Sequence, residues 1–279
     1  MRDIPAITKN LLIINVLMFA SYWVFGRLGI DLNDALGLHF ILASDFHIYQ
    51  LFTYMFMHAN ITHLFFNMFA LWMFGRIVES VWGAKRFLFY YLACGIGAGL
   101  IQECVQSVSY AAQGLGSYDF VMTEYGRITM DTYLNNWTTV GASGAIYGIL
   151  LAFGMLFPEE RIFIFPLPVP VKAKWFVILY AVLELSLGLG MPGDSVAHFA
   201  HLGGMLFGFL IIRYWRTHPS ASYGYGYNNT RNESDWEYNA RKKKEQDEVD
   251  RILDKIRKSG YDSLTADEKK KLFDSGKKL

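Results

Sequence analysis

The sequence has few cysteines and no visible internal repeat. Two of its 279 residues are cysteines, Cys94 and Cys104. On one helix, ten residues of separation place them about 15 Å apart along the axis, which is too far for a disulfide. We therefore expect no disulfide and assign both cysteines to packing. The missing repeat weakens the case for a transporter built from two related halves.

Charge is also scarce, but only in the first 212 residues. Residues 213–279 hold 16 of the 26 lysines and arginines and 12 of the 25 acidic residues. The first 212 residues hold only 10 basic and 13 acidic groups, too few to give every helix the charged face of a soluble protein. Apolar blocks of about the length that spans a bilayer recur there instead, at 7–25, 51–74, 87–108, 141–157, 175–190 and 196–215. The predicted fold is an all-α polytopic membrane protein with six transmembrane helices.

The segments between these blocks differ in their content of lysine and arginine. From the N-terminus to the C-terminus the counts are 2, 1, 3, 1, 3, 0 and 16. Because cytoplasmic loops carry the excess of basic residues, both termini are predicted to be cytoplasmic, and we expect a bacterial cytoplasmic (inner) membrane. The first block lacks a small-residue cleavage site, so we expect it to be retained as a span.

Three parts of the chain are predicted: a membrane domain at 1–216, a flexible linker at 217–234 and a charged cytoplasmic helical tail at 235–279. In the tail, apolar residues at helical spacing predict one helix, and the pair Thr265 and Glu268 predicts the capped start of a second. The apolar positions are Val249, Ile252, Leu253 and Ile256. A soluble helical pair is expected, with a basic patch on anionic lipid as the alternative. The lysine cluster 242–244 has no aromatic residues interleaved, so nucleic-acid binding is not expected.

A serine stands between small residues at the start of the fourth block. The stretch "TTVGASGAIYGILLAFGMLF" (138–157) contains Gly141, Ser143 and Gly144 before a purely apolar run. Small residues at this place let helices approach one another closely, which is one interpretation of the pattern. The other is that Ser143 is an exposed nucleophile.

The sixth block, "VAHFAHLGGMLFGFL", carries two histidines in a predicted bilayer helix. An ionisable group is costly there and usually functional. Gly204 and Gly208 follow His201 on the same helix face, so that face can approach another helix closely. By the loop count, His201 and Ser143 both lie near the outer side of the membrane, where they can meet. His198, nearer the surface, is taken as secondary.

The second block, "FMHANITHLFFNMFALW", places His63 and Asn67 on one helix face, again in the outer half. A buried asparagine can serve simply to join two helices. Together with Ser143 and His201, however, these residues supply a hydroxyl nucleophile, an imidazole base and donors for a developing oxyanion. That set is what acyl transfer requires.

These motifs resemble those of the rhomboid family of intramembrane serine proteases. The matching patterns are H-x-x-x-N at His63 and Asn67, G-x-S-G around Ser143, and A-H-x-x-G-x-x-x-G from Ala200 onward, in the family's order and on its spans two, four and six. The resemblance covers about residues 50–212. It implies a six-transmembrane-helix rhomboid-like bundle whose fourth helix starts below the membrane surface, at the bottom of a water-filled cavity.

The resemblance also implies roles for individual residues. Ser143 would be the nucleophile and His201 the general base, while His63, Asn67 and the Ser143 amide would form the oxyanion hole. Gly141 would let the chain bend so that this amide faces the substrate, and Tyr147 would stack on the histidine. Neither Glu184 in the fifth span nor Asp194 in the outer loop looks placed to complete a triad, so a Ser–His dyad is expected.

The expected function is that of an intramembrane serine endopeptidase that cleaves transmembrane protein substrates near the outer membrane face. No cofactor and no metal are expected; the partners are those substrates and membrane lipids, and nucleic acid is not among them. Two alternatives stay open: a catalytically inactive relative that binds transmembrane helices, and a small polytopic transporter. The long third loop, 109–140, shows no obvious structure of its own and serves either in substrate docking or as a passive insertion.

Overall fold

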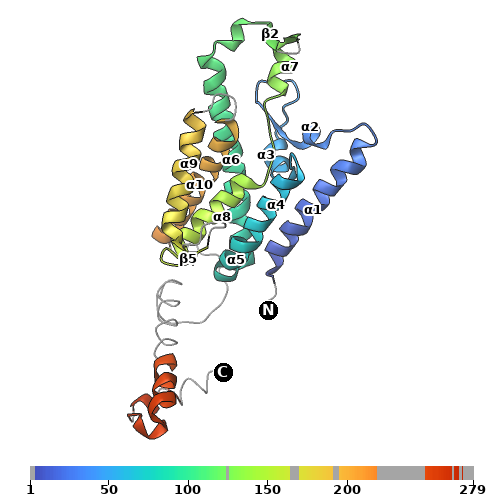
Figure 1. The fold of residues 1–279 in the computed structure, drawn as a ribbon. Helices are drawn as coiled ribbons and strands as arrows, with labels where there is room; N and C mark the ends of the chain where they lie inside the picture. The colour runs from blue at the N-terminus through green and yellow to red at the C-terminus, as the bar shows by residue number, and fades with distance from the viewer. Residues whose placement is uncertain are drawn as a thin grey trace. The chain divides into compact units, whose positions relative to one another are not determined.

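A computed structural model describes residues 4–123, 126–163, 170–190, 195–218, 249–265, 267–269 and 272. The chain divides into two units, Met1–Thr217 and His218–Leu279. In the first unit the main helices are α1 (Ala6–Gly26), α4 (Ile61–Ala70), α5 (Arg76–Trp82), α6 (Ala84–Ala112), α8 (Ser143–Leu156), α9 (Ala173–Gly190) and α10 (Ser195–Thr217) (Figure 1). A π-helical segment, η2 (Leu71–Gly75), joins α4 to α5.

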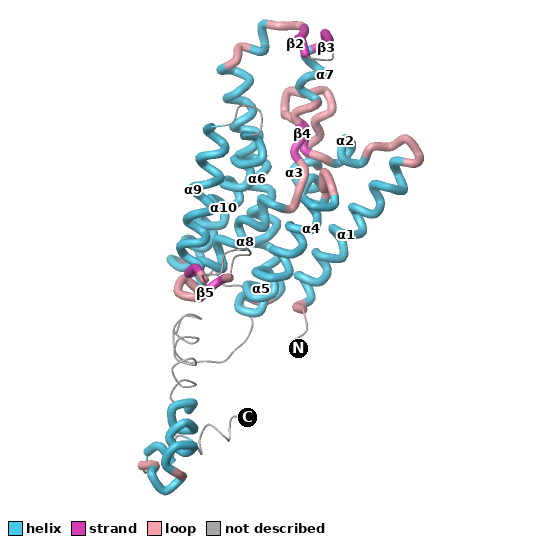
Figure 2. Tube along the Cα trace, in the orientation of Figure 1, coloured by secondary structure: helices cyan, strands magenta, loops and turns pink. Residues whose placement is uncertain are grey.

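Shorter elements connect these helices (Figure 2). The helical ones are α2 (Leu32–Leu36), α3 (Gln50–Thr53), η1 (Tyr54–Phe56), η3 (Leu115–Ser117) and α7 (Met130–Asn135). The strands are β1 (Leu38–His39), β2 (Phe120–Thr123), β3 (Gly126–Thr129), β4 (Thr138–Thr139), β5 (Arg161–Ile162) and β6 (Val171–Lys172). The strand pairings among the described residues are antiparallel: β1 with β4, β2 with β3, and β5 with β6.

Every one of the six apolar blocks contains a helix, and the arrangement fits a polytopic helical bundle. Among the described residues, four helices are long and apolar enough to cross a membrane: Ala6–Gly26, Ile61–Trp82, Ala84–Ala112 and Ala173–Gly190. Helix α8 is apolar but has 14 residues, which span about 21 Å, less than the bilayer core of about 30 Å. The count of six spans therefore stays a prediction.

The predicted start of the second span, at residue 51, was wrong. Residues 50–56 form the short helices α3 and η1, and the long helix begins only at Ile61. Met57 is extended, and the Asn60 side chain accepts a hydrogen bond from the His63 amide at 2.8 Å. Asn60 is thus the N-cap that starts the helix carrying His63 and Asn67.

Helix α1 is attached to the bundle by an acidic side chain. Its first amide groups have no partner within the helix, and they donate instead to the buried Glu79 of α5. The distances are 2.9 Å from the Ile7 amide and 2.7 Å from the Thr8 amide, and the Thr8 hydroxyl donates to the same carboxylate. Glu79 therefore has a structural role at the start of the first helix.

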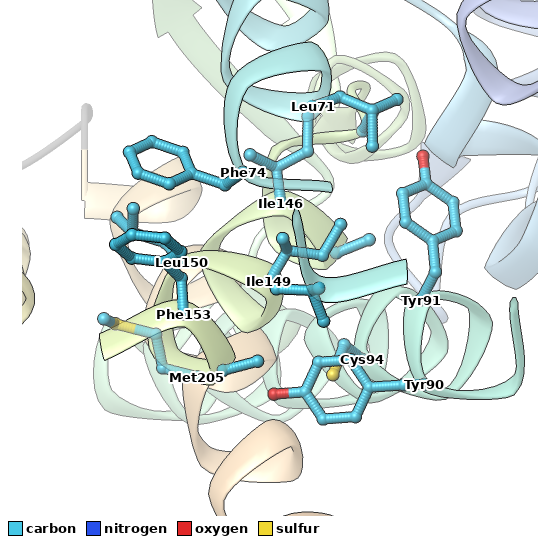
Figure 3. Close-up of a cluster of buried hydrophobic side chains, with 14 of the residues drawn as sticks. Leu71, Phe74, Tyr90, Tyr91, Cys94, Ile146, Ile149, Leu150, Phe153 and Met205 are labelled. Atoms are coloured by element: carbon cyan, nitrogen blue, oxygen red, sulfur yellow. The ribbon is translucent and has the colours of Figure 1, made fainter. Parts of the chain in front are cut away.

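The core lies where α6, α8 and α10 meet, and apolar side chains from these helices and from η2 fill it (Figure 3). Lipid tails are as apolar as leucine, so these helices associate through close packing more than through the hydrophobic effect. A methyl group added at Gly204 would lie 1.9 Å from the Gly144 carbonyl oxygen, so α8 and α10 touch through their backbones. The predicted close approach of the His201 face is confirmed at Gly204, whereas Gly208 packs on Tyr90 of α6.

The third loop does have structure of its own, contrary to expectation. Helix α6 continues to Ala112, the β2–β3 hairpin and α7 follow, and β4 pairs with β1 from the first loop (Figure 2). A small apolar cluster of Phe40, Ala43 and Leu134 holds the two loops together. The sequence did not reveal this because the pairing joins residues about a hundred positions apart.

The loop between α8 and α9 carries a compact ion-pair group. Glu159 lies 2.7 Å from the Lys172 ammonium and also pairs with Lys174. Hydrogen bonds from these two lysines lower the pKa of Glu159 to about 2. Two of the three basic residues counted for this loop thus pair with one of its acids.

In the second unit, residues 249–259 are helical, and Ile252 is buried. Leu253 was expected on the apolar face but is 48% exposed. The predicted capping box is confirmed: the Thr265 amide donates to Glu268 at 2.8 Å, and the Glu268 amide donates to the Thr265 hydroxyl at 3.3 Å. Most of the predicted linker lies outside the described residues, and the three-part division stays a prediction.

The two cysteines are unpaired, as expected. Cys94 is buried in the α6–α8 contact, where its sulfur would lie 2.6 Å from a methyl group added at Gly148. Cys104 is exposed, so its assignment to packing was wrong.

Candidate active site

Ser143 is the first residue of α8, and the chain before it is held from two sides. Strand β4 ends at Thr139, and the Gly141 amide donates to the Tyr54 carbonyl at 2.9 Å. Gly141 has φ +132°, a conformation that side chains disfavour. A methyl group there would also lie 2.8 Å from His63 Cε1. In Figure 1 the chain descends from α7 before α8 begins, so α8 starts between the other helices of the bundle.

His201 of α10 faces this serine. Its Nε2 lies 2.8 Å from the Ser143 hydroxyl oxygen, and both residues are half-buried. The pair forms because the Gly144–Gly204 contact brings the two helices together three residues beyond the histidine. The two residues that the motifs single out are therefore in hydrogen-bond contact.

Tyr147 lies one turn after Ser143 on α8 and covers the face of the His201 ring. The two ring centroids are 4.2 Å apart, and the planes are inclined by 6°. The stacking expected for Tyr147 is present in the structure. The Tyr147 hydroxyl donates to an oxygen of Glu184, which lies on α9.

Glu184 also reaches the far side of the His201 ring, which corrects the expectation that no acid is near. Its Oε2 lies 2.9 Å from His201 Nδ1 and 2.6 Å from His198 Nδ1. Serine, imidazole and carboxylate thus form a continuous hydrogen-bonded chain. The sequence carried one signal of this, because a glutamate in an apolar span is costly and is usually retained for function. The rotation of α9 about its axis, which aims Glu184 at α10, is set by packing.

His63 and Asn67 of α4 lie on the other side of Ser143. The His63 ring abuts Gly141 and meets the ring of His58 edge-on, with centroids 5.1 Å apart. The buried Asn67 amide donates to the His63 carbonyl at 3.0 Å. Within the described part of the chain, neither side chain hydrogen-bonds to Ser143. The structure therefore brings His63 next to the serine loop and leaves the oxyanion roles of both residues as predictions.

Chemically, this arrangement can move a proton. The Ser143 hydroxyl can donate to Nε2 of His201 while Nδ1–H donates to the Glu184 carboxylate. A histidine in that tautomer is a base toward the serine. One group of metal-ligand type also occurs among the described residues, namely Glu184, His198 and His201.

The helical bundle and the hydrogen-bonded serine–histidine pair are the features that the resemblance to rhomboid proteins leads one to expect. A family model described as the rhomboid domain matches residues 45–217, more than half of the chain. The chain belongs to the rhomboid family. A second model, of a family of unknown function (DUF6576), matches residues 232–278.

Curated relatives agree with this family. The chain is 30% identical over 155 residues to Rhomboid protein 1, mitochondrial, of Saccharomyces cerevisiae, covering 56% of this chain and 38% of that protein. It is 29% identical over 159 residues to the human Presenilin-associated rhomboid-like protein, mitochondrial, covering 57% and 36%. It is 28% identical over 166 residues to Rhomboid protease GluP of Bacillus subtilis, covering 58% and 25%. The matches thus span well under half of each relative.

Proposed function

We propose that the protein is an intramembrane serine endopeptidase that cleaves transmembrane proteins near the outer membrane face. The observation that carries this proposal is the 2.8 Å contact between His201 Nε2 and the Ser143 hydroxyl, with His201 Nδ1 bonded to Glu184. Family membership supports the same reaction, because one of the similar proteins is named a rhomboid protease.

In the proposed reaction, His201 Nε2 takes the hydroxyl proton as the Ser143 oxygen attacks the scissile carbonyl carbon. The carbonyl oxygen becomes an oxyanion, which the Ser143 amide, His63 and Asn67 stabilise. His201 then gives its proton to the leaving amine, and an acyl-enzyme remains on Ser143. Water, deprotonated by His201, hydrolyses that ester and frees the serine.

Glu184 has a positioning role in this proposal, and Ser143 and His201 remain the reacting pair. By accepting a hydrogen bond from His201 Nδ1–H, the carboxylate holds the tautomer in which Nε2 is unprotonated. It also stabilises the imidazolium that forms during attack. Tyr147 assists by covering the ring face and by donating to the same carboxylate.

The test is to label Ser143 with a fluorophosphonate probe and to follow cleavage of a model transmembrane substrate by the same preparation. The expected result is labelling and cleavage by the native protein, and neither by Ser143→Ala. A catalytically inactive relative would bind the substrate without being labelled. A transporter would neither be labelled nor cleave the substrate. The Ser143–His201 contact and the family both argue against these two alternatives.

We further propose that the protein lies in a bacterial cytoplasmic membrane with both termini in the cytoplasm, on the strength of the lysine and arginine counts. Single cysteines at Asp119 and at Ser220, in a background where the exposed Cys104 is serine, distinguish the orientations. An impermeant thiol reagent outside intact cells should modify the first and spare the second. The reverse result would place the active site toward the cytoplasm.

A further inference from the structure

The group around Glu184 contains one imidazole more than the proposed reaction needs. His198 precedes His201 by one turn of α10, and both Nδ1 atoms point to the same oxygen, Glu184 Oε2. The ligand atoms of the three residues all lie within 4.8 Å of one another. The proposed proton transfer uses His201 and Glu184 and leaves His198 without a part in it.

These three side chains match the protein ligands of a known type of zinc site. Two imidazoles and one carboxylate, with a fourth position open to solvent or substrate, bind Zn²⁺ in several metalloenzymes. Zinc–nitrogen bonds of about 2.1 Å place tetrahedral ligands about 3.4 Å apart, so shifts of about an ångström would suffice here. Imidazole ligands favour Zn²⁺, Ni²⁺ and Cu²⁺ over Mg²⁺ and Ca²⁺.

The surroundings suit a small ion. The side chains of His198, His201 and Glu184 are 15%, 17% and 9% exposed, so an ion can reach them while most of their surface is shielded from water. The carboxylate supplies the negative charge that a largely desolvated dication requires. Glu184 lies on α9 and both histidines lie on α10, so an ion bound by all three would bridge the two helices.

We propose that Glu184, His198 and His201 form an inhibitory binding site for a divalent transition-metal ion such as Zn²⁺. The inhibition rests on the proposed protease function, whereas the binding of the ion does not. A metal on His201 Nδ1 uses that nitrogen's lone pair, so the ring proton moves to Nε2. Nε2–H then donates to the Ser143 oxygen and can no longer accept its proton, and the general base is lost. No bond to the ion is needed for catalysis, and the ion acts only by blocking it.

Binding is measured first, on the Ser143→Ala variant without an affinity tag, so that the result does not depend on proteolysis. Co²⁺ is the probe, because its visible absorption reports tetrahedral nitrogen and oxygen ligands, and Zn²⁺ should displace it. One Co²⁺ per chain is expected. His198→Asn, which keeps an N–H near the position of Nδ1 for Glu184 but removes the ligand, should weaken binding at least tenfold, since even outer-shell changes cost 10–100-fold. The exposed His47, changed to Asn, is the matched control and should leave binding unchanged.

Activity is the second measurement. Zn²⁺ should inhibit the native protein reversibly, with full recovery on chelation. Relative to its own metal-free cleavage rate, His198→Asn should need at least tenfold more Zn²⁺ for the same inhibition. The proposed site would be overturned if no absorption band of tetrahedral Co²⁺ appears. Equal Co²⁺ affinity in His198→Asn and His47→Asn would overturn it as well. Tight binding without any proteolysis in the native protein would uphold the site and count against the protease function instead.

Discussion

The two sides of Ser143 differ in how completely their side chains are engaged. On the side of α9 and α10, the His201 ring is held at both nitrogens and on one face, by Ser143, Glu184 and Tyr147. On the side of α4, no hydrogen bond to the His63 ring nitrogens occurs among the described residues, and the Asn67 amide donates to its own helix. The proposed base is thus held before a substrate arrives, whereas neither of the proposed oxyanion side chains hydrogen-bonds to Ser143 in the described part of the chain.

This difference fits the chemistry proposed for each side. A base must be oriented in the ground state, because its tautomer and rotamer decide whether it can take the serine proton. Oxyanion donors are needed only when negative charge has developed, and contacts that exist only then lower the barrier most. An empty active site is therefore expected to show the first set of contacts and to lack the second.

The largest effect should come from the reacting pair. Ser143→Ala and His201→Ala should each lower kcat by roughly 10⁴-fold or more, and the double variant should be little worse than either, because the two residues act as a unit. Cleavage of a model transmembrane substrate is measured alongside the thermal transition, to show that the variants fold. Cleavage that survives in Ser143→Ala would remove the central claim, and added metal should rescue neither variant.

The next largest effect tests the less engaged side. If Asn67 turns toward the oxyanion during the reaction, Asn67→Ala should lower kcat by about 10²–10³-fold and raise KM far less. Both constants are measured per folded molecule on one preparation. Normal kcat with a lower Tm would mean that Asn67 only supports α4, and the oxyanion role would pass to His63 and the Ser143 amide.

A smaller effect is expected at Glu184, which acts through His201. Glu184→Gln should lower kcat by less than the loss of a reacting group, because the carboxylate acts through the orientation and tautomer of His201, and Glu184→Asp should recover part of the loss. Combined with His201→Ala, the change should cost nothing further, because the carboxylate has no other route to the serine.

The matched control for this test is Glu103→Gln. Glu103 is another buried acid of an apolar helix, and it accepts a hydrogen bond from the Ile41 amide at 2.7 Å, away from the site. The kcat of Glu103→Gln should stay near that of the native protein. If Glu184→Gln and Glu103→Gln lose the same amount of kcat, and each loss follows a lower thermal stability, then Glu184 only stabilises the fold.

The smallest effect is expected from the second unit. Truncation after His218 should change kcat/KM in detergent by less than about twofold, because all the proposed site residues lie within Met1–Thr217 and distant sites behave additively. Loss of most activity in a folded, monodisperse truncation would show that the tail organises the site. If the tail carries a basic patch that contacts lipid, the truncated protein should bind anionic vesicles more weakly than the full chain does.

Several features of the site could be predicted because they depend on local spacing. Tyr147 follows Ser143 by four residues, and Gly204 follows His201 by three, so each pair shares a helix face whatever surrounds it. The apolar blocks likewise predicted where helices form. The cost of burying histidines in such blocks pointed to a functional site before any contact was known.

What the sequence by itself determined is thus the approximate position of the long helices, the faces on which the candidate site residues lie and the family to which the motifs belong. The tertiary structure alone decided that Glu184 of α9 meets His198 and His201 of α10, that β1 pairs with β4, and that Asn67 bonds to its own helix. Helical periodicity depends on neighbours within one turn, and a sequence displays it directly. The rotation of one helix against another depends on how all their side chains pack, and contacts between distant segments are visible only once that packing is known.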